Sequence, residues 1–272
     1  MIDALRYEWM RIVTIRSTYW LTGLALAFAL AVAVAVSWGF ASEIGDPGGP
    51  SDLDISELGP WLGTQFARGG APHFLGFLLA MVGILAWGHE YRHGMVRATL
   101  TTLSSRTTVW AAKYLVVVVW VGVAVTACFF AAIFVGWLFL RDYAVDLVNA
   151  GTYEAWGRTV LYTVLLACLA MAFTGLVRNQ TAALVLLFLW PLAIENVITL
   201  IFFLVPGLRD HADLTRFLPF SAGGRIHNDS VFSAGDTLFG NPMTWVGGAV
   251  IFGGLTLALM VASLAWFRTR DA

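Results

Sequence analysis

The stretch HEYRH at residues 89–93 contains residue types that could bind zinc. On a helix, His89 and His93 lie one turn apart on the same face, so both imidazoles could reach one metal ion. Glu90 could then polarise a zinc-bound water for hydrolysis. The spacing therefore raises the possibility of a metalloprotease, which also needs a third ligand.

The rest of the chain does not supply that third ligand in the expected place. In the longer pattern H-E-x-x-H-x-x-G-x-x-H, Val96 and Thr99 occupy the positions of the Gly and of the third His. A catalytic zinc requires three protein ligands, and an intramembrane protease would also need an Asp that none of the apolar runs contains. An intramembrane zinc protease that uses His89, Glu90 and His93 is kept as an alternative interpretation.

A second candidate site lies in the apolar run 181–205, where Pro191 precedes Glu195 and Asn196. Proline lacks a backbone N–H and predicts a kink. A carboxyl group inside a membrane is costly and indicates either a functional site or a contact between helices. We keep both interpretations: these three residues form a substrate pathway or gate, or Glu195 fixes helix packing. An ion-coupled carrier that uses Glu195 is a further alternative, although such carriers usually have paired broken helices.

The composition predicts that these residues are positioned by membrane helices. The chain has 272 residues, of which 59% are hydrophobic and 12% are charged, whereas soluble domains have roughly 25% charged residues. A net charge of −1 gives no indication of a nucleic-acid partner. Cys128 and Cys168 both lie in apolar runs, which indicates neither a disulfide framework nor a metal cluster.

Six apolar runs are long enough to cross a bilayer as helices. Isolated strands would leave backbone groups unpaired in lipid, so helices are predicted for all six. We expect an all-α polytopic membrane protein, with one transmembrane domain over residues 1–272. The expected spans are residues 19–40, 72–88, 113–140, 156–177, 181–205 and 244–267. Small residues at every fourth position predict packing faces on the first and last spans (Ala25, Ala29 and Ala33; Gly254, Ala258 and Ala262).

Charge sets the expected orientation in a plasma membrane. A cytoplasmic N-terminus places ten of the 16 Lys and Arg residues inside and six outside, which is the bias that multi-pass proteins show. Six spans then place both termini in the cytoplasm. Residues 41–71 are predicted to form an exposed loop with a short helix near SDLDISEL, residues 51–58. The long outer segment 206–243 contains RFLPFSAGG, which is either a short helix dipping towards the membrane or a packed loop.

Two amphipathic segments are expected at the cytoplasmic face. Residues 1–18 have an apolar stripe at helical spacing and arginines on other faces, which is typical of a helix lying in the membrane interface. The stripe consists of Ile2, Leu5, Trp9, Ile12 and Val13. Between the second and third spans, the segment 89–112 has an expected helix break at Gly94. Val96, Leu100 and Leu103 follow it at spacings of four and three. This spacing predicts a short amphipathic helix within the cytoplasmic segment.

The stretch GHEYRHGMVRATLTTLSSRTTVWAAKYL, residues 88–115, resembles the first cytoplasmic loop of type-2 ABC transporter permeases. Their pattern is roughly E-[YF]-x-x-G-T-x-x-x-x-L-x-x-P-x-S-R, with a Lys a few residues later. The positions that match are Glu90, Tyr91, Gly94, Leu100, Arg106 and Lys113. Met95 and Ser104 stand where Thr and Pro are usual. Six spans, an N-terminal interfacial helix and the sequence LPFSA before the last span also fit this family.

The resemblance implies that this cytoplasmic loop docks into a separate ATPase subunit. The implied coupling residues are Glu90, Tyr91, Gly94, Arg97, Leu100 and Arg106. Of these, we expect Glu90 to bond the start of the loop helix or a basic residue of the ATPase. The chain contains no G-x-x-x-x-G-K-[ST] phosphate-binding loop, so we expect it not to be an enzyme and to bind no cofactor or metal itself. ATP and magnesium are expected on the partner.

The resemblance also implies the assembly and the direction of transport. Two permease copies, identical or related, would combine with two ATPase subunits in the lipid bilayer and export a substrate. A drug-like, peptide or lipid-like molecule is expected to pass between the permeases, alongside the first, second and fifth spans. The residues themselves give no basis for choosing among these substrates.

Overall fold

In the computed structural model, the structure describes residues 1–44, 58–68, 74–94, 105–143, 146–227 and 243–270. Within these ranges all regular structure is helical, because apolar runs of this length satisfy their backbone groups internally. The helices of the bundle are α1 (Ile2–Thr14), α2 (Arg16–Ile44), α3 (Leu58–Arg68), α4 (Phe74–His93), α6 (Arg106–Leu140), α7 (Ala150–Val177), α8 (Gln180–Leu189) and α13 (Trp245–Arg270).

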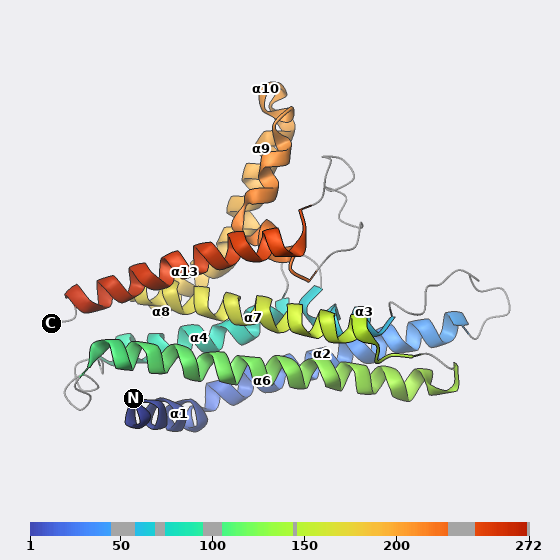
Figure 1. Ribbon diagram of the computed structural model, residues 1–272, viewed down its shortest axis with the longest axis horizontal. Helices are drawn as coiled ribbons and strands as arrows, with labels where there is room; N and C mark the ends of the chain where they lie inside the picture. The colour runs from blue at the N-terminus through green and yellow to red at the C-terminus, as the bar shows by residue number, and fades with distance from the viewer. Residues whose placement is uncertain (45–57, 69–73, 95–104, 144–145, 228–242, 271–272) are drawn as a thin grey trace.

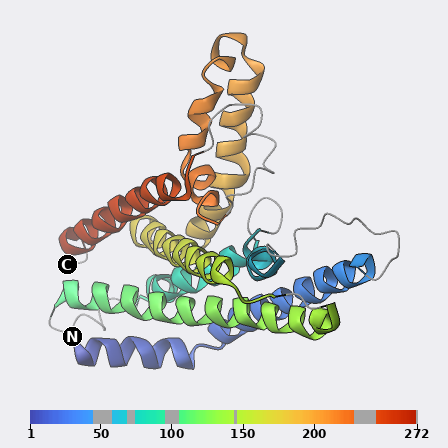
Figure 2. The same cartoon turned by 45° about the vertical axis from the view of Figure 1, so that its right-hand side comes forward.

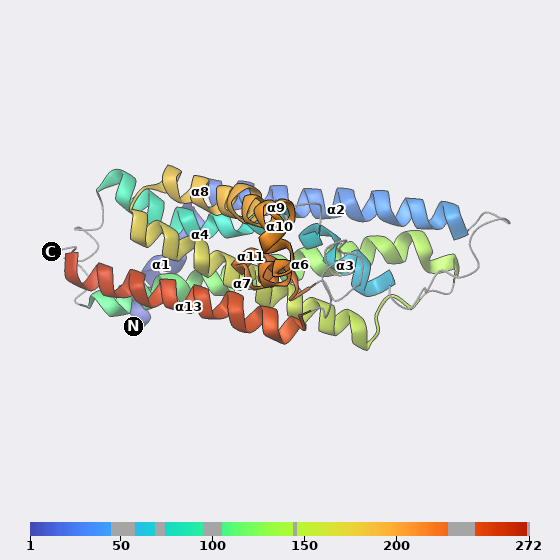
Figure 3. The ribbon, with the colours of Figure 1, turned by 90° about the horizontal axis from the view of Figure 1, so that it is seen from above.

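The long helices α2, α4, α6, α7 and α13 run side by side along the longest axis of the molecule (Figures 1 and 3). Helix α1 and the end of α13 lie at the same end of this bundle (Figure 1). The start of α6 also lies beside the end of α13, because Arg106 Nη1 donates to the carbonyl oxygen of Arg268 over 3.2 Å.

Among the described residues, five helical segments are long and apolar enough to cross a membrane, as in a multi-pass membrane protein. They correspond to five of the six expected spans. Their bounds are Arg16–Ser42, Arg106–Tyr143, Ala150–Val177, Gln180–Leu204 and Trp245–Thr269. The remaining expected span, 72–88, coincides with α4, which is not among these five. Six crossings and cytoplasmic termini therefore stay predictions.

Helix α4 lies at the centre of the bundle, packed most extensively against α7 and also against α2, α6 and α8. Its side chains from Phe77 to Ala80 are all buried. The backbone of α4 approaches α7 closely at Gly83, where a Cβ atom would lie 2.7 Å from the carbonyl oxygen of Ala167 in α7. The absence of a side chain at this position lets the two helices pack closely.

Two expected loops are partly helical. The cytoplasmic segment expected over 89–112 is shorter, because α4 continues to His93 and α6 already begins at Arg106. Residues 95–104 lie outside the described residues, as does the amphipathic helix expected there. The expected exposed loop 41–71 includes α3, in which Leu58 and Leu62 are buried against the bundle. Burial of these leucines overrides the local Gly and Pro content.

The fifth expected span is broken, as Pro191 predicted. It consists of α8, the π-helix η3 (Trp190–Glu195) and α9 (Asn196–Leu204). Helices α9 and α10 (Pro206–Arg209) project away from the bundle (Figures 1 and 2). The chain returns through η4 (Ala212–Phe217) to α11 (Pro219–Gly224), a short helix whose Phe220 is buried. Of the two expectations for RFLPFSAGG, the structure has the short helix, packed into the bundle.

The two expected small-residue faces differ in the structure. Ala25, Ala29 and Ala33 of α2 are each 1% exposed, so this packing face is confirmed. The face of Gly254, Ala258 and Ala262 on α13 is exposed, and α13 instead buries the large side chains of Phe252 and Phe267. Spacing identified both stripes, but only packing decides which of them a neighbouring helix covers.

Candidate functional site

The N-terminal helix α1 presents an acidic side chain to the bundle. Its buried residues are Ala4, Glu8 and Ile12, spaced four apart, and this face packs against α6. Apolar residues that were expected to form its membrane-facing stripe, such as Ile2 and Trp9, are 80% and 42% exposed. Glu8 therefore lies in the middle of the packed face, where a carboxylate needs a partner.

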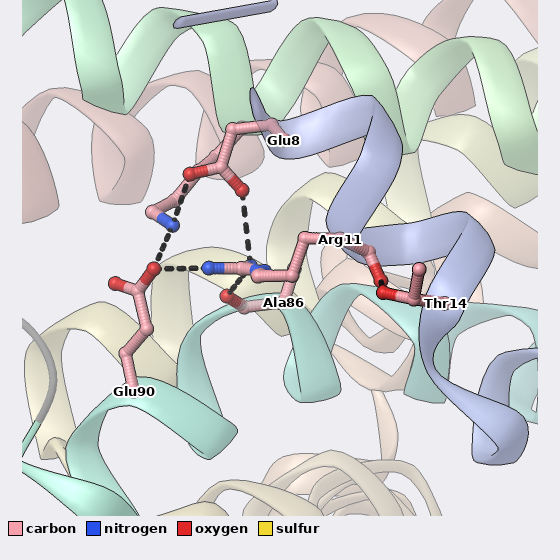
Figure 4. A network of polar contacts seen from close by, with 6 residues as sticks. Glu8, Arg11, Thr14, Ala86 and Glu90 are labelled. Carbon is pink, nitrogen blue, oxygen red and sulfur yellow. Dashed lines mark hydrogen bonds and ion pairs between the residues drawn. The ribbon is translucent and has the colours of Figure 1, made fainter. Parts of the chain in front are cut away.

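That partner is a network of four charged side chains from three helices. Lys113 Nζ of α6 lies 2.6 Å from Glu8 Oε1 and 2.5 Å from Glu90 Oε1 of α4. Arg11 of α1 forms ion pairs with Glu90 and, over 3.1 Å, with Glu8, and it also donates to the carbonyl oxygen of Ala86. Figure 4 shows Glu8 and Arg11 on one helix facing Glu90 and Ala86 on another.

The network is electrically balanced, with two carboxylates and two cations in a buried space. The side chains of Lys113, Glu8 and Glu90 are 0%, 1% and 5% exposed, and that of Arg11 is 15% exposed. Lys113 Nζ also lies 5.1 Å from the centre of the Trp87 ring, where a cation is attracted to the aromatic face. A balanced and well-bonded cluster can be held in a region of low dielectric, whereas removal of one member leaves an uncompensated charge.

Among the expected coupling residues, Glu90, Tyr91, Gly94 and Arg106 are described, whereas Arg97 and Leu100 lie outside the described residues. Tyr91 stacks on Trp87, one turn earlier, with ring centres 5.8 Å apart. Gly94 has a φ of 64°, a left-handed conformation that favours glycine and ends α4. The break that the sequence predicted at Gly94 is thus confirmed.

Glu90 has different partners from those expected. We predicted that its carboxylate would bond the start of the loop helix or a basic residue of an ATPase. The carboxylate instead bonds Lys113 and Arg11 of its own chain, and the residue is only 4% exposed. Glu90 therefore fixes the end of α4 to α1 and α6 and presents no free surface to a second protein.

Glu195 lies apart from this network, in a contact between η3 and α11. Its Oε1 accepts the backbone N–H of Phe220 over 2.7 Å. Its Oε2 accepts the N–H of Ser221 over 2.8 Å and the Ser221 hydroxyl over 2.9 Å. Glu195 is 4% exposed. Of the two interpretations kept for this residue, these contacts favour the one in which it fixes helix packing.

The neighbours of Glu195 in the sequence support the broken helix. The side-chain amide of Asn196 donates to the carbonyl oxygens of Pro191 and Leu192 over 3.0 and 2.9 Å. These carbonyls belong to the π-helical turn, where the regular pattern of backbone bonds is interrupted. Asn196 is exposed, and its side chain bonds within its own helical segment. Pro191 interrupts the helix, and Asn196 bonds the carbonyls of the interrupted turn.

Sequence reasoning missed Glu8 and Arg11 as parts of the site. A signal was present, because Glu8 falls between Ala4 and Ile12 on one helical face. A carboxylate on the face that packs indicates a buried cation elsewhere, and Lys113 is the only lysine of the chain. Recognising the pair required knowing that α1 packs on α6.

The zinc interpretation gains no support from the geometry. The Glu90 carboxylate is bonded to two cations, so it is not placed to activate a water. Among the described residues, no group of three His, Cys, Asp or Glu side chains is arranged to hold a metal. A scan of protein-family models and a search of curated proteins gave no match to this chain.

Proposed function

We propose that this chain is the membrane-spanning subunit of an ATP-driven ABC transporter. A separate ATPase subunit would dock on the segment between α4 and α6. The observation that carries the proposal is the buried network of Glu8, Arg11, Glu90 and Lys113. It joins the last turn of α4 to the first turns of α6 and to α1. The two ends of the cytoplasmic segment are therefore held together.

A mechanical connection of this kind is what coupling requires. ATP-driven closure of ATPase subunits does work on membrane helices only if the element that they push is firmly attached to those helices. The ion network attaches both ends of the segment, and Arg106 adds a bond to the carbonyl oxygen of Arg268 in α13. A push on the segment would thus move α1, α4, α6 and α13 together.

The partners and cargo belong to the same proposal. Two ATPase subunits would supply ATP and magnesium, and a second permease, identical or related, would complete the pathway in the plasma membrane. The residue resemblance at Glu90, Tyr91, Gly94, Leu100, Arg106 and Lys113 supports the choice of an ABC exporter over other transporters. A drug-like, peptide or lipid-like cargo is consistent with an apolar bundle.

Co-purification with candidate ATPase subunits tests this function. We expect a stable complex whose ATPase activity depends on the permease. Glu90→Ala should lower the transport-coupled activity, while Glu154→Ala is a control because Glu154 pairs with Arg158 of the same helix, α7. Stoichiometric zinc with no ATPase partner would overturn the proposal and favour the protease. Unchanged coupling in Glu90→Ala would show that the network does not transmit the motion.

A further inference from the structure

The first third of α2 has a shallow hollow of about 510 Å³ on its outward face. This face lies on the opposite side of the helix from the buried stripe of Ala25, Ala29 and Ala33. All of the lining residues belong to α2, which lies along an edge of the bundle (Figure 3). They are Arg16, Tyr19, Trp20, Gly23, Leu24 and Ala27.

Gly23 keeps the hollow open. A Cβ atom at this position would meet no other atom within 4 Å, so no described side chain fills the space. From Arg16 to Ala27 the hollow follows the helix for about 16 Å at the usual rise. The hydrocarbon core of a bilayer is roughly 30 Å thick, so the hollow has the length of one leaflet.

A cation stands at one end of this hollow. Arg16 is exposed and, unlike Arg11, its side chain forms no ion pair with any residue that the structure describes. The buried carboxylates of Glu8 and Glu90 are already paired with Lys113 and Arg11. The charge of Arg16 is therefore accessible to an anionic ligand.

Aromatic side chains surround the charged end of the hollow. Tyr19 and Trp20 are 49% and 78% exposed, as expected for rings at the level of lipid headgroups. Tyr19 makes an edge-on contact with Trp120 of α6, with ring centres 5.8 Å apart, and the Trp120 indole N–H donates to the Thr22 hydroxyl over 3.2 Å. The wall of the hollow beside Arg16 is thus attached to a second helix.

We propose that this α2 hollow binds one anionic phospholipid of the cytoplasmic leaflet. The guanidinium of Arg16 pairs with the headgroup phosphate, and one acyl chain lies over Gly23 and Ala27. The charge bias of the chain predicts that this end of α2 faces the cytoplasmic leaflet, whose surface is negative.

Charge and length favour this lipid over other occupants. A symmetric contact between two copies through this face would place both Arg16 side chains at the same depth, where like charges repel. A hollow with the length of one leaflet fits a lipid that stays in that leaflet and is not cargo. The inference does not depend on the proposed function, since lipid binding needs no ATPase.

Photolabelling of the full chain in nanodiscs tests the site. The two probes carry the same diazirine in one acyl chain and have either a phosphatidylglycerol or a phosphatidylcholine headgroup. Labelled peptides are located by mass spectrometry, with α13 as the reference segment. We expect phosphatidylglycerol to label residues 16–27 about fivefold more than phosphatidylcholine, which is the effect of one cation on anionic lipid.

Two pairs of variants separate the headgroup from the acyl chain. Arg16→Gln should abolish the preference for phosphatidylglycerol, whereas Arg92→Gln removes an exposed cation at the end of α4 and should keep it. Gly23→Leu fills the hollow and should reduce labelling of α2 by both probes. Gly39→Leu is its control, because a Cβ atom at Gly39 also meets nothing within 4 Å but Gly39 lies outside the hollow.

A second measurement uses stability. Phosphatidylglycerol should raise the Tm of the unmodified chain and of Arg92→Gln more than that of Arg16→Gln, because a ligand that binds only the folded chain stabilises it. The Tm of each variant without added lipid shows whether the variant is folded. Arg16 is exposed, so its substitution should leave this value unchanged.

Equal labelling of α2 by the two probes, or a preference that survives in Arg16→Gln, would show ordinary contact with bulk lipid and overturn the site. Weak labelling by both probes, in a dimer that Gly23→Leu dissociates, would mean that a second copy covers the hollow, which also overturns it. None of these measurements uses an ATPase subunit, so this inference and the proposed function fail separately.

Discussion

At the scale of single residues, Lys113 is the side chain on which the cytoplasmic end of the bundle depends most. It is fully buried and lies within ion-pair distance of Glu8 and Glu90. Each carboxylate comes from a different helix, so the lysine acts as a bridge between α1 and α4. Arg11 is the second cation and partly compensates the same carboxylates.

Lys113→Met should destabilise the protein by about 3–5 kcal/mol, because two buried carboxylates are left with one arginine. Thermal unfolding of the purified protein in detergent measures this loss. The double variant Lys113→Met with Glu8→Gln removes one charge of each sign and should recover much of the stability. A double variant that is less stable than Lys113→Met alone would argue against the charge balance.

Glu195 joins η3 to α11 through three hydrogen bonds. Glu195→Ala should therefore release α11, with a cost of about 1–3 kcal/mol for the unpaired buried donors. Hydrogen exchange measures the release directly, as faster exchange of the Phe220 and Ser221 amides. Asn196→Ala is the matched control, because the side chain of Asn196 bonds the carbonyls of Pro191 and Leu192 in its own segment, so its removal should leave α11 unchanged.

At the scale of elements, close helix contacts depend on particular glycines. Gly83→Ala should destabilise the α4–α7 contact by about 1–3 kcal/mol, because the new Cβ would lie 2.7 Å from the Ala167 carbonyl oxygen and 2.9 Å from Met171 Cγ. Gly122→Ala on α6 is the control. A Cβ atom there meets nothing within 4 Å, so this change should stabilise α6 by about 0.5–1 kcal/mol. Thermal unfolding of both variants measures these changes in stability. Equal changes for Gly83→Ala and Gly122→Ala would contradict the packing argument.

The broken fifth helix shows how a local signal and a long-range contact combine. Pro191 predicts an interruption from its own chemistry, and the π-helix η3 occurs at that position. The contact that holds the interrupted segment comes from α11, which lies 25 residues away from Glu195 at Phe220. The sequence therefore indicated where the helix breaks, whereas packing determined what the freed carboxylate binds.

At the scale of the whole molecule, the long helix α6 extends from one end of the bundle to the other (Figure 1). The start of α6 lies near the end of α13 through the bond from Arg106 to Arg268. Helix α6 has 35 residues and ends at Leu140, which gives a length of about 50 Å at the usual rise. Asp146 and Thr269 are therefore expected on opposite sides of a membrane.

Cysteine labelling tests this topology. Asp146→Cys should react with a membrane-impermeant maleimide in intact cells, and Thr269→Cys only after permeabilisation, because the charge bias places the chain ends inside. Both positions are exposed in the structure, whereas the native Cys128 and Cys168 are buried and should remain unlabelled. Labelling of Thr269→Cys from outside would show that the protein has the reverse orientation.

The sequence by itself determined the helical character of this protein and the approximate limits of its long helices. In lipid, a backbone must satisfy its hydrogen bonds within the same segment, so an apolar run of sufficient length predicts a helix without knowledge of its neighbours. Gly94 and Pro191 were likewise identifiable as breaks, because each acts through its own backbone.

Only the tertiary structure decided the partners. Glu8 and Lys113 are 105 residues apart, and the Glu195 carboxylate bonds the backbone of Phe220, 25 residues away. Such pairs depend on which faces of the helices meet, and this is determined by the shapes of many side chains at once. The HEYRH sequence alone is compatible with a zinc site because it does not show which side chains lie next to Glu90. In the fold, Glu90 pairs with Lys113 and Arg11.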